Sequence, residues 1–120
     1  VGESLPVEVG TGAYLRGVHV VDGRLAYAVG DGGRLLERSG GAWRMLAQPA
    51  SAMDLRDVVA FGPTTVFVAA MDASGHLLHF DGTTWTEPFA QAPVLRAVDG
   101  VDPQELWASG HDGTLVHWGP

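Results

Sequence analysis

The chain has 120 residues, 46% of them hydrophobic, which is the size and composition of one folded domain with a buried core. A formal net charge of −7, with only 7 basic residues, argues against the basic face that nucleic-acid-binding proteins present. There is no cysteine, which excludes disulfides and thiol chemistry, and no apolar run has the length of a membrane-spanning helix.

The sequence repeats itself with a period of 40 residues. Leu15, Leu55 and Leu95 are each followed by an arginine and then, two positions further on, by a valine. The chain is therefore an internal repeat of three units. The predicted units are residues 15–54, 55–94 and 95–120, with the segment 1–14 before them.

The first segment, residues 1–14, contains a short alternating stretch from Leu5 to Val9. Counting back by the repeat period aligns Leu5 with Met45, which follows the tryptophan of the first unit. We therefore predict that this stretch is a fourth strand detached from its own unit.

Each unit is predicted to form short strands separated by Gly, Asp and Pro turn signals. Tight turns with a positive φ are expected at Asp22-Gly23, Asp31-Gly32-Gly33, Asp81-Gly82 and Asp112-Gly113. Pro63 and Pro103 should lie between first and second strands. The Ala-rich segment 47–53 predicts one helical turn. The strands are expected at 16–21, 25–30, 34–39 and 43–48, then 56–61, 65–71, 76–81 and 85–89, and finally 96–101, 105–110 and 114–118.

Four strands in about 40 residues are typical of a blade of a β-propeller, an all-β fold. A blade packs both its faces on neighbouring blades, and the second strands at 25–30 and 66–70 are small and apolar on both sides. The third unit ends before its fourth strand. The N-terminal strand is expected to complete that last blade and so to clasp the ring.

The repeat resembles bacterial propeller repeats that have an aromatic residue, a small residue and Gly in the second strand, then an apolar pair, Asp-Gly and Trp. The matching segments are Tyr27-Ala28-Val29-Gly30, Trp107-Ala108-Ser109-Gly110 and His79-Phe80-Asp81-Gly82-Thr83-Thr84-Trp85. Propellers of this kind include lectins, assembly factors and secreted scaffolds, so the resemblance implies the propeller architecture and leaves these functions open.

The run from Asp81 to Trp85 is also similar to the Asp-box of sialidase-like propellers and to a Trp-Asp-Gly-x-x-Trp turn of small fucose-binding propeller lectins. Those lectins place an arginine in the second strand of the blade, where this chain has Ala28 and Val68.

Three blades do not close a ring, so the chain is expected to be a fragment or a protomer. Two copies joined head to tail give six blades with twofold symmetry, which we favour, and three copies give nine. The predicted partner is thus a second copy of the chain, with a protein or a glycan as a further ligand.

Arg16, Arg56 and Arg96 begin the innermost strand of each predicted blade, so a six-bladed ring carries six guanidinium groups around one mouth of its channel. These groups suit an anion or carboxylate ligand. In the alternative interpretation, each arginine pairs with a backbone carbonyl or an aspartate of the adjoining turn, such as Asp31, Asp72 or Asp112.

Trp43, Trp85 and Trp118 are the aromatic candidates. Between blades at the outer rim such a side chain stacks on a sugar, or it fills the wedge between blades and donates its indole N–H to a carbonyl. Trp118, beside the chain end, is expected at the seam between subunits.

No metal, cofactor or catalytic site is predicted. His76 and His79 have helical ligand spacing, but a strand places them on opposite faces. His79, His117 and Glu37 are equivalent and are expected to be structural. Ser109-Gly110-His111-Asp112 offers no triad, and Asp99 and Asp102 are predicted to form turns in loops.

The sequence predicts a non-enzymatic binding or scaffold module that assembles itself into a closed propeller ring. One alternative is a carbohydrate-binding, lectin-like propeller. Another is an excised or engineered propeller fragment without a natural activity. The compartment is not indicated.

Overall fold

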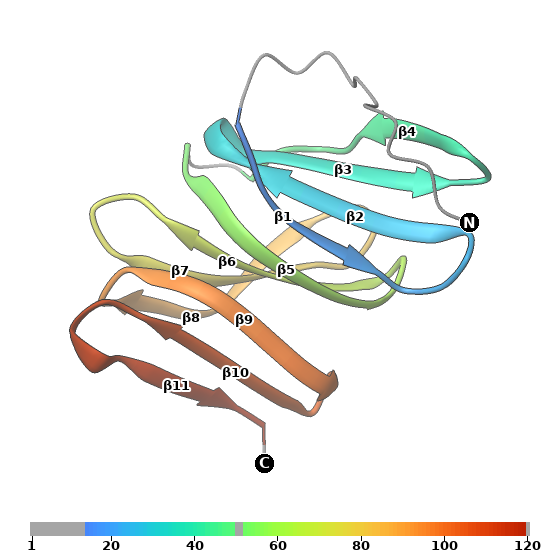
Figure 1. Cartoon of the computed structure of the whole chain (residues 1–120). Coiled ribbons are helices and arrows are strands. Elements are labelled where there is room, and N and C mark those ends of the chain that lie inside the picture. The colour runs from blue at the N-terminus through green and yellow to red at the C-terminus, as the bar shows by residue number, and fades with distance from the viewer. Residues whose placement is uncertain (1–13, 50–51, 120) are drawn as a thin grey trace, which may run out of the picture.

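The computed structural model describes residues 14–49 and 52–119, which form three antiparallel β-sheets (Figure 1). We call the sheets blades 1, 2 and 3, in chain order. Blade 1 contains β1 (Leu15–Val20), β2 (Leu25–Gly30), β3 (Arg34–Ser39) and β4 (Ala42–Met45). Blade 2 contains β5 (Asp54–Gly62), β6 (Thr65–Met71), β7 (Gly75–Phe80) and β8 (Trp85–Ala92). Blade 3 contains β9 (Leu95–Asp102), β10 (Glu105–Gly110) and β11 (Leu115–Trp118).

Within each blade the strands pair with their neighbours in chain order. Single 3₁₀ turns, η1 (Asp31–Gly33) and η2 (His111–Gly113), join the second and third strands of blades 1 and 3. Among the described residues no helix is long and apolar enough to cross a membrane.

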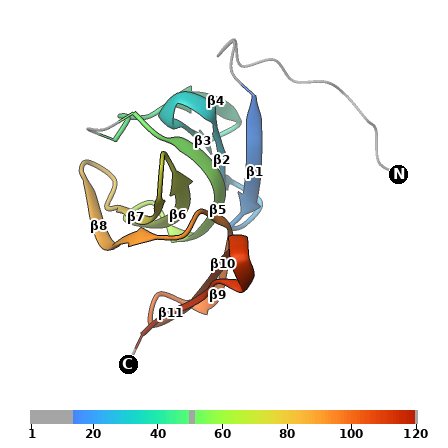
Figure 2. The same cartoon turned by 90° about the vertical axis from the view of Figure 1, so that its left-hand side faces the viewer.

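The blades fan out from their first strands, with blade 2 between the other two (Figure 2). β1 and β5 come close together, since a Cβ added to Gly17 would lie 3.0 Å from Cα of Asp57. Side chains of β1, β5 and β9 therefore sit where consecutive blades meet.

Two apolar clusters fill the spaces between the blades. One joins Tyr27 and Leu35 of blade 1 to Val58 and Leu78 of blade 2. The other joins Phe67 of blade 2 to buried residues of blade 3. Because strand side chains alternate between faces, blade 2 contributes one set of side chains to the cluster with blade 1 and the other set to the cluster with blade 3.

Several local expectations are wrong. The helical turn expected at 47–53 is missing from the described residues of that segment, 47–49 and 52–53, which have no regular secondary structure. The Ala47 carbonyl accepts a hydrogen bond from the Trp85 indole. Leu5–Val9 lies outside the described residues.

The turn expectations also differ from the structure at two places. Gly23 does not have a positive φ, because the Asp22 carboxylate accepts hydrogen bonds from the Arg24 and Leu25 amides and closes the turn itself. Asp99 lies inside β9 and Asp102 is its last residue, so neither lies in a loop.

Candidate functional site

The three candidate arginines lie near the start of β1, β5 and β9, at the end of the blades that also carries η1 and η2. Arg16 forms a two-point contact with the Asp31 carboxylate, with Nε 3.1 Å from Oδ1 and Nη2 3.0 Å from Oδ2. This pair matches the alternative interpretation, in which the arginine neutralises an aspartate of the adjoining turn.

Arg56 and Arg96 bind neutral groups instead. Nε of Arg56 lies 3.1 Å from the Met71 sulfur, and Nε of Arg96 donates to Nε2 of His111 at 2.8 Å. In the described part of the chain neither arginine forms an ion pair with a carboxylate. The expected pairings with Asp72 and Asp112 are therefore absent from these residues.

The local turns explain this difference. Asp72 accepts hydrogen bonds from Ser74 and His76, so its carboxylate is turned toward its own loop. In blade 3, His111 occupies the repeat position of Asp31, and Asp112 lies one residue further on, at the position of Gly32, with φ 58°.

The electrostatics of this end couple blades 1 and 2. The hydrogen bond from Arg16 lowers the pKa of Asp31, and the nearby charge of Arg56 lowers it further against the opposing effect of burial. The same contact with Asp31 raises the pKa of Arg16. Asp54 of β5 also accepts a hydrogen bond from the Gly32 amide at 3.0 Å, so the turn and the next blade are held together.

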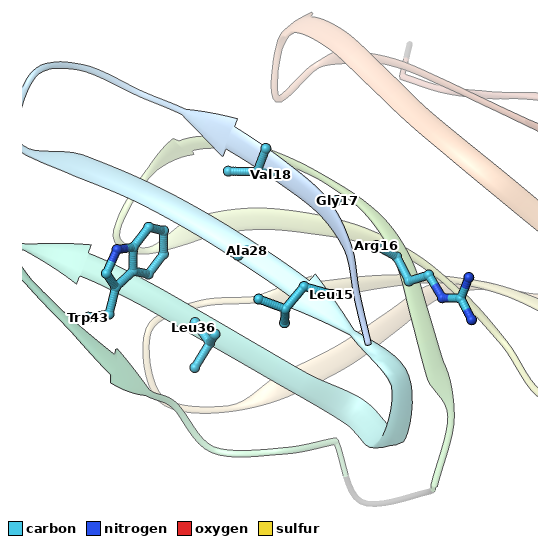
Figure 3. Close-up of a pocket in the computed structure, with 7 residues that line it drawn as sticks. All are labelled: Leu15, Arg16, Gly17, Val18, Ala28, Leu36 and Trp43. Atoms are coloured by element: carbon cyan, nitrogen blue, oxygen red, sulfur yellow. The ribbon is translucent and has the colours of Figure 1, made fainter. Parts of the chain in front are cut away.

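The tryptophan candidates have different environments. The Trp85 indole donates to the Ala47 carbonyl at 2.8 Å and its ring lies 5.0 Å from that of Phe80. It thus fills the wedge between blades 1 and 2. Trp43 lines a hollow on the outer face of blade 1 (Figure 3).

Trp118 is 38% exposed and lines a cleft between blades 2 and 3, at the end opposite the arginines. His79 and Gln104 border the same cleft. An aromatic ring beside polar groups in a cleft between blades is an arrangement that can accept a sugar.

A corresponding cleft lies between blades 1 and 2, at residues that the sequence motifs do not indicate as a site. It contains Arg24, Arg44 and the buried Glu37. The Glu37 carboxylate accepts hydrogen bonds from the Tyr27 hydroxyl at 2.7 Å and from Arg44 at 2.9 Å. A buried Glu opposite a tyrosine on the neighbouring strand is the signal that indicates this network.

The two equivalent histidines pack on aromatic rings. His79 stacks on Phe67 at 4.8 Å and His117 stacks on Trp107 at 4.4 Å. The described residues contain no group of three or more His, Cys, Asp or Glu side chains arranged to hold a metal ion.

No protein-family model and no curated protein matches the chain. Among solved structures it is similar to one described as YCF48 bound to D1 peptide, with a TM-score of 0.76 and 18% sequence identity. The chain has a β-propeller fold. The similarity covers 92% of this propeller chain but 39% of that protein, so the chain spans well under half of its length.

Proposed function

We propose that this chain is a protein-binding β-propeller module without enzymatic activity, whose contact surface is the end that carries Arg16, Arg56 and Arg96. A propeller of similar fold is described as bound to a peptide, which supports a protein ligand. The partner is an extended peptide segment with a carboxylate group.

The observation that carries the proposal is the state of Arg56 and Arg96. Their Nε atoms donate to a thioether and to an imidazole, so both guanidinium groups keep their positive charge and further N–H donors. Arginine binds carboxylates through two parallel hydrogen bonds, which fits these side chains to a peptide carboxylate.

We expect the Arg56→Gln/Arg96→Gln double variant to bind carboxylate-bearing peptides at least about 10-fold more weakly than the unchanged protein, because hydrogen bonds to charged groups contribute more than neutral ones. The measurement is fluorescence anisotropy with a panel of labelled ten-residue peptides that have free C-terminal carboxylates. The same peptides with amidated C-termini show whether the terminal carboxylate is the group recognised.

Arg24→Gln is the matched control, because Arg24 is exposed in the turn after β1, at the opposite end of the blade. Equal loss of binding in the control and the double variant would argue against this end as the site. A shift of melting temperature with monosaccharides, abolished by Trp118→Ala, in place of peptide binding would favour the carbohydrate-binding alternative.

The proposal also includes the assembly of the module. Three blades leave a propeller open, and two copies joined head to tail complete six blades, with the N-terminal segment of each copy supplying the fourth strand of blade 3. This assembly is supported by blade 3, whose sheet has three strands among the described residues and β11 at its edge, whereas the sheets of blades 1 and 2 have four strands.

Native mass spectrometry at micromolar concentration tests the assembly. The expected species has twice the mass of the 12.6 kDa chain. Deletion of residues 1–13 should shift the population toward the monomer, because blade 3 then loses its proposed fourth strand. A species of three times the chain mass would indicate nine blades, and a monomer of the full chain would refute ring closure by a second copy.

A further inference from the structure

Blade 1 has an apolar face that no described residue covers. Val18 of this face is 65% exposed, whereas its repeat equivalents Val58 and Val98 are 3% and 4% exposed. Those two valines are buried because a preceding blade packs on them. By repeat equivalence, this exposed face of blade 1 corresponds to the face on which a preceding blade packs in blades 2 and 3.

Blade 3 has the opposite uncovered face. Trp107 is 43% exposed, whereas its equivalents Tyr27 and Phe67 are 0% and 5% exposed beneath the following blade. Leu115 is exposed as well, whereas its equivalents in the other blades are buried. By repeat equivalence, this exposed face of blade 3 corresponds to the face on which a following blade packs in blades 1 and 2.

The uncovered face of blade 1 contains a hollow. On blade 1 a hollow of about 360 Å³ is lined by Val18, Ala28, Leu36 and Trp43 (Figure 3). Arg16 borders it, but its side chain is directed away (Figure 3). Trp107 stands on the face that would meet this hollow, in the position that Tyr27 has between blades 1 and 2.

Each junction within the chain also contains one hydrogen bond between innermost strands. At the first junction the Ala60 amide donates to Nδ1 of His19 at 2.7 Å, and at the second the Val98 amide donates to Oδ2 of Asp57 at 2.9 Å. In both cases the donor comes 41 residues after the acceptor. In each case a polar side chain of the innermost strand, His19 or Asp57, accepts a backbone amide of the next blade.

Asp99 places such an acceptor on the uncovered face of blade 3. It is the repeat equivalent of His19 and lies in β9. Its Oδ1 accepts the amide of the next residue, Gly100, at 2.9 Å, as Oδ1 of Asp57 accepts that of Val58 at 3.0 Å. Among the described residues Oδ2 of Asp99 has no hydrogen-bond partner, whereas Oδ2 of Asp57 binds the following blade.

We propose that blade 3 of one copy docks on blade 1 of a second copy, with Trp107 in the hollow and Oδ2 of Asp99 accepting the amide of Val20 of the partner subunit. The register follows from the repeat, in which Asp99 corresponds to His19, the acceptor of the first junction. In the unchanged repeat pattern Val20 is equivalent to Ala60, whose amide is the donor at the first junction. This inference rests on the proposed ring assembly and specifies the residues at the interface between its two copies.

Asp99→Ala tests the seam by sedimentation equilibrium of the full chain. A closed ring of two copies has two seams, and the loss of one hydrogen bond at each should raise the dissociation constant of the dimer about 30-fold. Asp102→Ala is the matched control, because Asp102 lies in the same strand and its Oδ1 accepts a local amide, that of Gln104. It should leave the dimer within about twofold of the unchanged protein.

Asp99→His is the second variant, since histidine is the acceptor at the equivalent position of the first junction. At pH 8 its neutral imidazole accepts the amide, so the dimer should recover. Below about pH 6 the ring is protonated and cannot accept, so the dimer should dissociate. This pH-dependent recovery would not follow from a defect in folding.

A dimer that is equally stable in the Asp99→Ala and Asp102→Ala variants would overturn the seam while leaving the ring assembly in place. A full chain that stays monomeric would overturn both. Peptide binding through Arg56 and Arg96 is measured separately and is judged on its own result.

Discussion

One position of the repeat, on the third strand of each blade, is filled by Glu37, His79 or His117, and its cross-strand neighbour is always aromatic. Burial raises the pKa of the Tyr27 hydroxyl, and its hydrogen bond to Glu37 raises it further. The histidines stack on their aromatic partners instead. The same site is thus stabilised by a hydrogen bond in blade 1 and by ring stacking in blades 2 and 3.

His76 forms a second residue-scale contact that depends on charge. Its side chain is 12% exposed and both ring nitrogens contact carboxylates, those of Asp72 and Glu87. Burial lowers the pKa of His76, but the hydrogen bonds to Asp72 and Glu87 outweigh it and the net pKa is raised. Carboxylates are acceptors only, so this geometry requires the doubly protonated ring.

We predict that His76→Gln destabilises the protein at pH 5.5 and that the difference in the free energy of unfolding shrinks as the pH rises to 8. A group with a raised pKa in the folded state stabilises fully below its unfolded value of 6.5, and this contribution disappears above the folded pKa. Urea unfolding across this range measures it.

The control is Glu87→Gln, introduced both into the unchanged protein and into the His76→Gln variant. Its effect at pH 5.5 should be smaller when His76 has already been replaced, because the two side chains share one contact. Parallel stability curves for His76→Gln and the unchanged protein would contradict the prediction. The range stops above the acidic region, where Asp72, whose pKa is lowered, begins to lose its own contribution.

The positions of the arginines could be predicted from the repeat, but not their partners. The three arginines share a register, and each contacts the residue 15 positions further on, which is Asp31, Met71 or His111. The repeat therefore sets the place of the partner, whereas the chemistry of the partner changes from a carboxylate to a thioether and an imidazole. The two extra residues of the second unit, Ala73 and Ser74, follow Met71 and leave this spacing unchanged.

At the scale of the strands, the structure explains why two units of the repeat have a glycine at the end of their second strand. Gly30 and Gly110 end β2 and β10, where a Cβ would overlap the carbonyl oxygens of Tyr14 and Val94, respectively. The Val94 carbonyl accepts the amide of His111, which fixes the start of β9. The repeat has glycine at this position in the first and third units and Ala70 in the second, and the structure shows that close approach of two backbones accounts for the two glycines.

Gly110→Ala should therefore lower the free energy of unfolding by about 1 to 3 kcal/mol, because the added methyl group displaces the backbone of β9. Gly23→Ala is the control, since no atom lies within 4 Å of a Cβ there and its φ is not positive. It should change stability by less than about 0.5 kcal/mol. Urea unfolding of both variants measures the contrast, and equal effects would show that strand closure tolerates the methyl group.

The strands themselves could be predicted well from turn residues and apolar patterning. The largest differences are at fourth strands, where β4 ends at Met45 and β8 continues to Ala92. These strands lie at the outer edge of each blade, so their ends depend on one pairing partner rather than two. Inner strands, paired on both sides, have bounds closer to the expected ones.

At the scale of the whole molecule, repeat length and blade composition identify the propeller fold, but the junctions could not be predicted. His19 and Asp57 each accept a backbone amide from the next blade, and such acceptors leave no pattern because any residue supplies the donor. The number of blades in a ring depends on the angle between neighbours. That angle follows from the packing of side chains such as Tyr27 and Phe67, which differ from junction to junction.

Blade 2 differs from its neighbours in having both faces covered by other described residues. In a linear array of repeats, stability is a sum of unit and interface terms, so the unit with two interfaces opens last. Fluctuations of a single chain should then begin as fraying of the outer blades and rarely reach β6. Blade 2 would then be the folding nucleus from which the chain refolds toward both ends. A newly synthesised chain would become stably folded only once blade 2 has packed against both blade 1 and blade 3.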